Sequence, residues 1–491
     1  MARLDPHSYA DSDQPQTRSI EFDLEVDFDR RVLRGEIALW FGAPASGALD
    51  LDTRDLKIAA VEGARRWELG APERILGGRL RLELAGVDSV RIRYQTSPQA
   101  SALQWLPGPF FFTQCQPIHA RSIFPLQDTP RVRVTVRRSR LRVPAGMQVL
   151  MAAAAFGGGE FEMPQPIPPY LLAFAAGDLV KRDLSPRCAV WAQPSLADAA
   201  AWEFAEVEKM LAAAEQLFGP YEWDRYDILV MPPSFPYGGM ENPRLTFATP
   251  SLLAGDRSLV NVIAHELAHA WTGNLVTNAS ANDFWLNEGF TVYAERRILE
   301  ELLGRDGSEL HAAIGRHDLE VALQRFANRP ELTKLRTNLE GIDPDEAYST
   351  VPYEKGYLLL RRMEEIAGRE QWDSFLRSYL AKFRFQSITT QDFLDQLPAA
   401  LRPTAGRWVD STGLPDDAPV PQAREIVEPR DPTELLVFLH AQKNPDLDAL
   451  DRRYGLSQRK SLELRTAFVG LQLEHGAPGA VDGARRIALE T

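Results

Sequence analysis

Residues 265–271, HELAHAW, constrain this 491-residue chain more than any other segment. On an α-helix, His265 and His269 stand four positions apart and therefore project from the same face. Glu266, one position further round, is placed to act as a base beside that face without being a ligand. Glu288, in the later segment WLNEGF, leaves room for one helix to end and a second to return a carboxylate. Two imidazoles and a carboxylate form a catalytic zinc site, in which the fourth metal position stays open.

The residues around these four side chains favour two amphipathic helices. Apolar residues recur at helical spacing in both segments: Val262, Ile263, Leu267 and Trp271 in the first, and Leu286, Phe290, Tyr293, Ile298 and Leu302 in the second. The polar stretch TNASAND lies between them. A His-Glu-x-x-His pattern alone also arises by chance in helices whose histidines are ordinary core or surface groups. The amphipathic context favours the metal site.

Composition excludes several classes of protein. A hydrophobic share of 44% and a charged share of 25% are typical of a soluble globular chain. The net charge of −13 argues against a nucleic-acid surface, which needs a basic patch. Cys115 and Cys188 are too few for a disulfide framework. The polar N-terminus does not resemble a signal peptide, and no apolar run is long enough for a bilayer. We therefore expect a cytoplasmic monomer with no nucleic-acid or membrane partner.

The pattern of apolar residues changes along the chain. Alternation with period two dominates until about residue 180 and predicts a β-rich N-terminal domain over 1–180. Helical spacing then predominates, including a predicted helix from Asp198 to Phe218, and we assign 181–415 to the catalytic domain. The Pro- and Asp-rich stretch 416–432 is typical of a linker, and 433–491 is again helical. The predicted fold class is a multidomain α+β protein.

Two further segments carry residue types suited to a peptidase. In PSFPYGGMENPRLTF, adjacent glycines allow a close backbone approach, and Glu241 offers a carboxylate for a substrate ammonium group. A simple turn with a solvated glutamate explains the same spacing. In IDPDEAYSTVPYEKG, the hydroxyl of Tyr348 or Tyr353 is a candidate donor to a developing oxyanion, although a tyrosine in a helical region is more often part of the core.

Together these segments resemble the gluzincin aminopeptidases of peptidase family M1, most closely its leukotriene A-4 hydrolase and aminopeptidase B branch. The matching stretches are QCQPIHARSIFPLQDTP at 114–130, PPSFPYGGMENP at 232–243, VIAHELAHAWTGNLVTN at 262–278, FWLNEG at 284–289 and IDPDEAYSTVPYEKG at 342–356. The resemblance covers nearly the whole chain. It implies a saddle-like β N-terminal domain, a thermolysin-like α/β catalytic domain and a C-terminal α-helical domain.

The resemblance also implies a role for each matched residue. His265, His269 and Glu288 correspond to the ligands of one zinc ion per chain. Glu266 corresponds to the general base and Tyr353 to the oxyanion donor. The implied substrate-binding positions, with Glu241 holding the free amine of a peptide, are Gln116, Gly238, Gly239, Met240, Glu241, Asp345 and Tyr348.

The chain departs from the family pattern in two places. Ala281 stands where the family has an aromatic residue, which predicts a wider pocket wall. A helical face formed near Val481 and Ile487 runs to Thr491 without a capping glycine, whereas members of the family continue further and supply a basic pair for the substrate carboxylate. We therefore expect that the C-terminal helical domain is partial and cut within a helix.

These observations predict a zinc aminopeptidase that acts on peptides with a free N-terminus, with epoxide hydrolysis as a secondary activity. Two alternatives stay open. The first is an epoxide hydrolase acting mainly on a lipid, in which Asp345 directs the water. The second is a catalytically silent binding protein on the same scaffold, against which the intact Glu266 argues.

Overall fold

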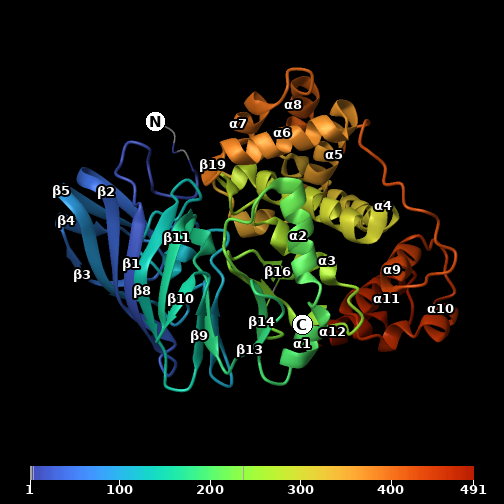
Figure 1. Cartoon of the computed structure of the whole chain (residues 1–491), viewed down its shortest axis with the longest axis horizontal. Helices are drawn as coiled ribbons and strands as arrows, with labels where there is room; N and C mark the ends of the chain where they lie inside the picture. Colours follow the sequence, from blue (N-terminus) through green and yellow to red (C-terminus); the bar gives the residue numbers. More distant parts are fainter. Residues whose placement is uncertain (1–2, 4, 236, 491) are drawn as a thin grey trace.

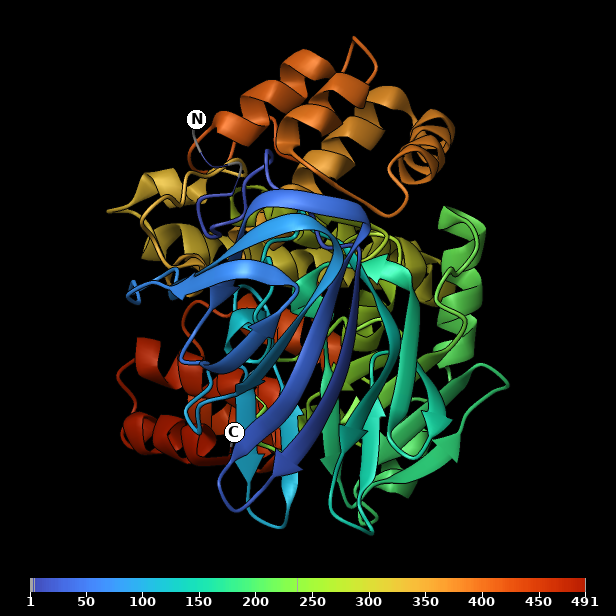
Figure 2. The same cartoon turned by 90° about the vertical axis from the view of Figure 1, so that its left-hand side faces the viewer.

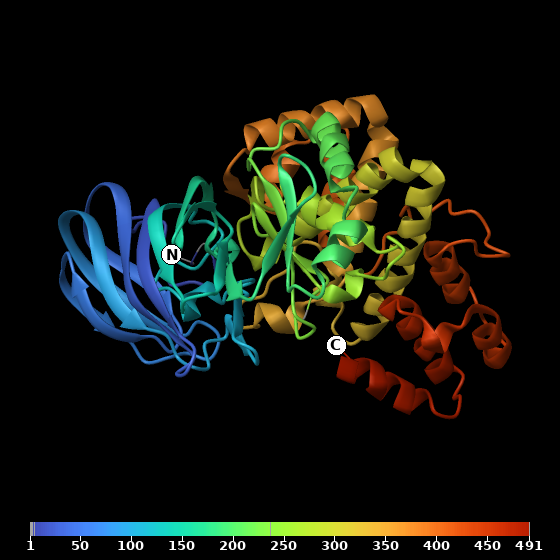
Figure 3. The same ribbon diagram turned by 60° about the horizontal axis from the view of Figure 1, so that its bottom comes forward.

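The computed structural model describes residues 3, 5–235 and 237–490 of the chain. Strands gather at one end of the molecule and helices at the other (Figure 1). The N-terminal strands, the central mixed region and the last helices follow one another along the long axis (Figure 3). The predicted α+β class is therefore confirmed. The expectation about the chain end concerns Thr491, which lies outside the described residues.

A large, mostly antiparallel sheet forms the N-terminal part, and its strands face the viewer in Figure 2. In spatial order they are β10 (Ala154–Gly157), β11 (Glu160–Ile167), β8 (Val134–Arg142), β1 (Ser19–Asp27), β2 (Val32–Thr53), β5 (Gly78–Gln95) and β3 (Lys57–Glu62), with β4 (Ala64–Leu69) also paired to β5. Along β1, Ile20, Phe22, Leu24 and Val26 are buried and alternate with half-buried polar residues. This alternation is the period-two pattern of the sequence, with one face turned to the core.

A smaller antiparallel sheet lies between the large sheet and the rest of the molecule. Its strands, in spatial order, are β6 (Leu103–Leu106), β7 (Phe110–Thr113), β12 (Phe174–Gly177) and β9 (Gln148–Met151). Every residue of β7 and β12 is buried. Because β7 ends at Thr113, the next residues, including Gln116, leave this sheet toward the central region.

A mixed sheet organises the central region. Its strands, in spatial order, are β13 (Val180–Asp183), β14 (Cys188–Ala192), β15 (Tyr226–Val230), β17 (Leu245–Ala248) and β16 (Gly239–Met240). The pairs β14–β15 and β15–β17 are parallel, and β16 pairs antiparallel with β17 at the sheet edge. The two adjacent glycines and Glu241 therefore lie at an edge that leaves backbone groups available to a ligand.

Helices pack on this sheet and on one another, and two of them hold the metal-binding motif. They are α1 (Ala197–Glu203), α2 (Val207–Phe218), α3 (Val260–Ala268) and α4 (Trp285–Arg325), followed by α5 (Gly356–Ala367), α6 (Arg369–Lys382), α7 (Thr390–Gln396) and α8 (Arg402–Asp410). The single helix predicted from Asp198 to Phe218 is wrong, because the chain breaks between α1 and α2. The buried Glu203 carboxylate at this break accepts hydrogen bonds from the backbone N–H groups of Gly255 and Arg257.

Residues 411–431 are all described and contain neither a helix nor a strand. After them come α9 (Pro432–His440), α10 (Leu447–Tyr454), α11 (Leu462–Glu474) and α12 (Ala480–Glu490). Leucines of α9 and α11 form a small core of their own with Leu456 and Phe468. Within the described part of the chain, no helix is both long and apolar enough to span a membrane.

A buried arginine joins the N-terminal strands to the metal-binding region. Arg133, just before β8, donates hydrogen bonds to the carbonyl of Pro166 at 2.8 and 3.0 Å, to the carbonyl of Asn274 at 2.5 Å and to the hydroxyl of Thr277 at 2.6 Å. A side chain from the N-terminal part of the chain therefore holds the loop after α3 in place.

Candidate active site

Three predicted ligand side chains meet where α3 faces the start of α4. The Nε2 atoms of His265 and His269 lie 3.2 Å apart. The Oε2 atom of Glu288 lies 3.4 Å from the first nitrogen and 3.5 Å from the second. The spacing of the motif on α3 and the return of α4 thus bring together the predicted trio.

These separations fit a tetrahedral zinc ion. With ligand bonds of about 2.0–2.1 Å, donors at tetrahedral angles stand about 3.4 Å apart. The Oε2 atom of Glu288 is buried and has no hydrogen-bond partner among the described residues. An unsatisfied buried carboxylate oxygen is costly, and metal coordination would satisfy it.

The other ring nitrogens are held by partners that the sequence analysis did not identify. Nδ1 of His265 lies 3.1 Å from Oε2 of Glu295, and Nδ1 of His269 lies 3.1 Å from both the carbonyl of Thr272 and the hydroxyl of Thr291. Such contacts turn the Nε2 atoms toward a metal. Glu295 follows Glu288 by two helical turns, and that spacing was the signal that could have revealed it.

A second set of potential ligands overlaps the first. Ligand atoms of Glu241, Glu266 and His269 also lie within 4.8 Å of one another. Oε1 of Glu241, however, already accepts hydrogen bonds from Gln116 at 3.2 Å and Asn287 at 3.4 Å. Because both sets use His269 and Glu241 is already engaged, the first trio is the better metal site.

Glu241 lies beside the ligands, with only 4% of its surface exposed. It follows β16, and the amide of Asn274 fixes its backbone carbonyl at 2.7 Å. Gln116 approaches from the N-terminal sheets and Asn287 from α4. Met240 is buried and contacts Gln114, whereas Gly238 and Gly239 line the same cavity as the ligands. Glu241 is therefore a fixed carboxylate within a cavity.

Two glycines bring Tyr353 close to Glu288. A Cβ atom on Gly289 would lie 2.7 Å from Cα of Gly356, and the reverse contact has the same length. Only glycine permits this approach of α4 to the chain before α5. The π-helical turn Val351–Lys355 therefore packs against α4, with the Tyr353 ring stacked on His265 at 6.1 Å between centroids. The hydroxyl of Tyr353 lies 3.2 Å from that of Tyr348.

Charges in the cavity shift several pKa values. Burial, together with neighbouring carboxylates, raises the pKa of Glu266 well above its usual value. Burial and Glu288 likewise raise the pKa of Glu241. Burial also raises the pKa of Tyr353, so this phenol keeps its proton at neutral pH and remains a donor. Acids crowded in this way favour a cation among them.

A second, largely apolar cavity of about 360 Å³ meets the first at Gln116, Tyr237 and Tyr348. Ala281 and Phe284 form part of its wall. The position at which the sequence predicts a wider pocket, Ala281, therefore lines this cavity. Asp345 also lines it, but its carboxylate lies 2.9 Å from Nε2 of His119, a residue that the sequence analysis did not identify. All seven predicted substrate-binding positions thus lie in or beside the two connected cavities.

Comparison with known proteins agrees with this geometry. Residues 202–411 match the model of the peptidase family M1 domain. The chain is 40% identical over 459 residues to leukotriene A-4 hydrolase of Xenopus laevis, covering 84% of this chain and 74% of that protein. It is 44% identical over 370 residues to aminopeptidase B of Rattus norvegicus, covering 70% of this chain and 55% of that one.

A solved structure supports the same relationship. Native leukotriene A4 hydrolase from Saccharomyces cerevisiae superimposes with a TM-score of 0.87 at 32% identity, covering 96% of this chain and 87% of the other. The chain belongs to peptidase family M1. It is accordingly a zinc-dependent aminopeptidase, as predicted, and the family implies the metal for which the trio is suited.

The closeness of β16 to α3 gives a first prediction. A Cβ atom on Gly239 would lie 2.4 Å from Oε1 of Glu266, whereas on Gly238 its nearest neighbour is Cγ1 of Val262 at 3.6 Å. Gly239→Ala should displace the flexible Glu266 side chain without unfolding the protein. We expect turnover of a small aminoacyl anilide to fall about 10²-fold, the cost of a displacement of about 1 Å.

Gly238→Ala is the matched control for this prediction, because it adds the same methyl group at the adjacent residue, just before β16. It should lose far less activity than Gly239→Ala, because its methyl group does not meet Glu266, and both variants should keep their zinc content and melting temperature. Equal activity in the two variants would show that the position of Glu266 is not critical.

Proposed function

We propose that this chain removes the first residue from peptides that carry a free α-amino group. The observation that carries the proposal is the position of Glu241, buried next to Gln116 and within 4.8 Å of ligand atoms of Glu266 and His269. In a peptide, two bonds separate the α-nitrogen from the first carbonyl carbon, a span of about 2.5 Å. A substrate whose ammonium group is paired with Glu241 therefore presents its first peptide bond to the ligand trio.

We further propose that His265, His269 and Glu288 hold one zinc ion per chain. The two potential ligand sets share His269, which supports one ion rather than two. When bound there, zinc lowers the pKa of a coordinated water toward 7 and polarises the scissile carbonyl.

Glu266 and Tyr353 have the positions needed for proton transfer and for charge stabilisation. Oε2 of Glu266 is buried without a hydrogen-bond partner among the described residues, so it is available to accept the proton of the attacking water. The same carboxyl group then delivers this proton to the leaving amine. The protonated Tyr353 donates to the oxygen that becomes negative. Gly238 and Gly239 let the substrate backbone lie along β16.

Substitutions that preserve shape separate chemistry from folding. Glu266→Gln keeps the metal ligands but removes the base, and we expect a loss of several orders of magnitude in kcat. Tyr353→Phe should lose a factor of about 10²–10³, typical for one oxyanion donor. Elemental analysis should find one zinc per chain in both variants and in the native protein. Near-normal turnover in either variant, or a native protein without zinc, would contradict the assigned roles.

The ammonium pairing predicts strict selectivity for free amines. Acetylation of the substrate leaves the buried Glu241 unpaired, and an unpaired buried charge is costly. We expect acetylated peptides to be poor substrates compared with their free counterparts, in measurements of kcat/KM. Glu241→Ala should weaken binding of amine-bearing inhibitors far more than binding of a simple zinc chelator. Efficient cleavage of internal bonds in acetylated peptides would indicate an endopeptidase instead.

The apolar cavity favours a second candidate activity, the hydrolysis of an allylic lipid epoxide. Asp345, Tyr348 and Gln116 line the cavity that meets the metal site and can direct water within it. The hydrogen bond between Asp345 and His119 orients the Asp345 carboxylate. His119 in turn lies 2.9 Å from the hydroxyl of Ser101. Incubation with leukotriene A-4 should yield one dihydroxy product, and this yield should fall in Asp345→Asn. Only the non-enzymatic mixture of products would count against this activity.

Three coarser features complete the proposal. We place domain boundaries at 1–180, 181–415 and 433–491, with 416–432 as the linker, which agrees with the absence of helix and strand across 411–431. Free and buried Cys115 and Cys188 suit a reducing cytoplasm. A monomer is the simplest assembly, because the predicted ligands and substrate-binding residues come from one chain.

A further inference from the structure

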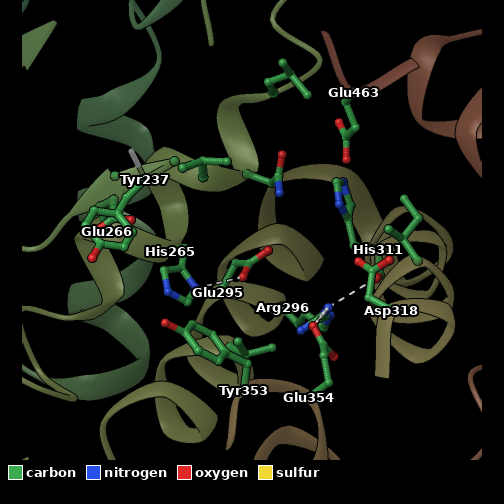
Figure 4. Close-up of a pocket in the computed structure, with 18 of the residues that line it drawn as sticks. Tyr237, His265, Glu266, Glu295, Arg296, His311, Asp318, Tyr353, Glu354 and Glu463 are labelled. Carbon is green, nitrogen blue, oxygen red and sulfur yellow. Dashed lines mark hydrogen bonds and ion pairs between the residues drawn. The ribbon is translucent and has the colours of Figure 1, made fainter. Parts of the chain in front are cut away.

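The active-site cavity continues past the metal ligands toward the C-terminal helices. Its lining includes Ile314 and Asp318 from α4, Leu436 from α9 and Glu463 from α11. In Figure 4, Tyr237 and Glu266 lie on one side of His265, whereas His311, Asp318 and Glu463 lie on the other. We call this second side, defined by His311, Asp318 and Glu463, the acidic arm.

The acidic arm holds two exposed carboxylates. Arg296 and His317 lie near Asp318 and favour its ionised form, but neither forms an ion pair with it. The Nη2 atom of Arg296 is paired with Glu354 at 2.8 Å. Glu295 is similarly engaged with His265. The side chains of Asp318 and Glu463 form no ion pair or hydrogen bond with any described residue. Both are accessible from the cavity, so a ligand can reach them.

Repulsion between Asp318 and Glu463 adds to the free-energy cost of ionising both carboxylates. Partial desolvation by the cavity walls and the nearby Asp318 raise the pKa of Glu463 to about 7, although the residue is exposed. Partial desolvation also raises the pKa of the exposed Asp318, and His317 and Arg296 offset only part of this shift. A cation bound between the two carboxylates would remove this cost, because an opposite charge favours the ionised form of each.

His311 gives independent evidence for a ligand at this place. It is 9% exposed, lines the cavity, and its ring forms no hydrogen bond with any described residue. Burial lowers the pKa of His311, so the ring is neutral near pH 7 and offers an acceptor nitrogen. Figure 4 shows the ring directed toward Glu463. An acceptor that faces the cavity beside two carboxylates without ion pairs suits a ligand group that both donates hydrogen bonds and carries positive charge.

The direction of a bound peptide identifies which part of the substrate reaches the arm. With its ammonium group at Glu241, a peptide passes the ligand trio with its first carbonyl and continues on the leaving-group side. The first side chain faces the junction with the apolar cavity at Gln116 and Tyr237. The residues after the cleaved bond then extend into the part of the cavity that continues along α4 toward α11.

We propose that Asp318 and Glu463, with His311, form a subsite for an arginine or lysine side chain of the peptide, located after the cleaved bond. The subsite selects substrates by the residues of the leaving peptide rather than by the residue removed. It rests on the proposed aminopeptidase function, because Glu241 sets the direction of the peptide.

The test uses the zinc-loaded protein and amidated tetrapeptides. Each peptide begins with the residue whose anilide is cleaved fastest and carries either arginine or its neutral isostere citrulline at position two, three or four. At one of these positions, the ratio of kcat/KM for arginine to that for citrulline should be about five- to tenfold, as for a partly desolvated charge pair. High salt should reduce this ratio.

Asp318→Asn and Glu463→Gln should each lower this ratio, and the double variant should bring it close to one. Glu320→Gln is the matched control, since Glu320 is an exposed residue of α4 whose partner is Arg316. It removes the same charge from a chain of net charge −13 and should leave the ratio unchanged. Turnover of the anilide, which has no residue beyond the leaving group, should be the same in all variants.

Three outcomes would overturn the inference, and the experiment distinguishes them. A native ratio near one at all three positions, with normal anilide turnover, contradicts the subsite alone. A ratio that falls equally in Glu320→Gln shows that only the net charge of the protein matters. Absence of anilide turnover in the native protein contradicts the proposed function itself, and with it the subsite.

Discussion

The structure depends on a cluster of buried acids around two imidazoles. Glu241, Glu266, Glu288 and Glu295 are each at most 7% exposed and come from β16 and its loop, α3 and α4. Burying so many carboxylates is costly unless cations balance them. Within the trio, one proton on His265 would do so in part, since the neighbouring carboxylates of Glu288 and Glu295 outweigh burial and raise its pKa. Zinc binding requires that proton to leave, so metal and proton compete for the same place.

The need to balance these buried charges explains why each of the four glutamates has a different role. Glu288 has its free oxygen between the two imidazoles, Glu295 orients one of them, and Glu241 is held by amides from two directions. Oε2 of Glu266 is fully buried without a partner among the described residues, and Glu266 lies outside the trio. The same acid type therefore serves as ligand, orienting group, ammonium binder and base, and the neighbours of each side chain decide which role it takes.

The acidic arm extends the same principle to the substrate. Its carboxylates lie in a solvent-accessible part of the cavity, so the cost of leaving them unpaired is smaller than in the cluster around the metal. A peptide cation can thus be exchanged during turnover, whereas the buried cluster needs a resident ion. The metal site and the arm both include residues of α4, with Glu288 before the kink of this helix at Gly304 and Asp318 after it.

The sequence predicted the parts of the site that depend on local geometry. The spacing of His265 and His269 on a helix, and the alternation along β1, follow from fixed periodicities. The sequence analysis did not identify Glu295, because a glutamate in an amphipathic helix is usually an ordinary surface residue. Only the packing of α4 on α3 shows its contact with His265. Gln116 was predicted only through the family resemblance and His119 was not identified, because their contacts depend on which sheet faces the site. The break between α1 and α2 depends on a contact of Glu203 with residues fifty positions away, which periodicity does not reveal.

The most direct test of this account is a crystal structure of the zinc-loaded protein with a bound inhibitor that carries a free amine, recorded at the zinc absorption edge. The anomalous peak should lie between His265, His269 and Glu288, with Glu266 outside the coordination sphere and the inhibitor nitrogen hydrogen-bonded to Glu241 and Gln116. A peak between Glu241, Glu266 and His269, or an amine bound away from Glu241, would contradict the assigned division of roles.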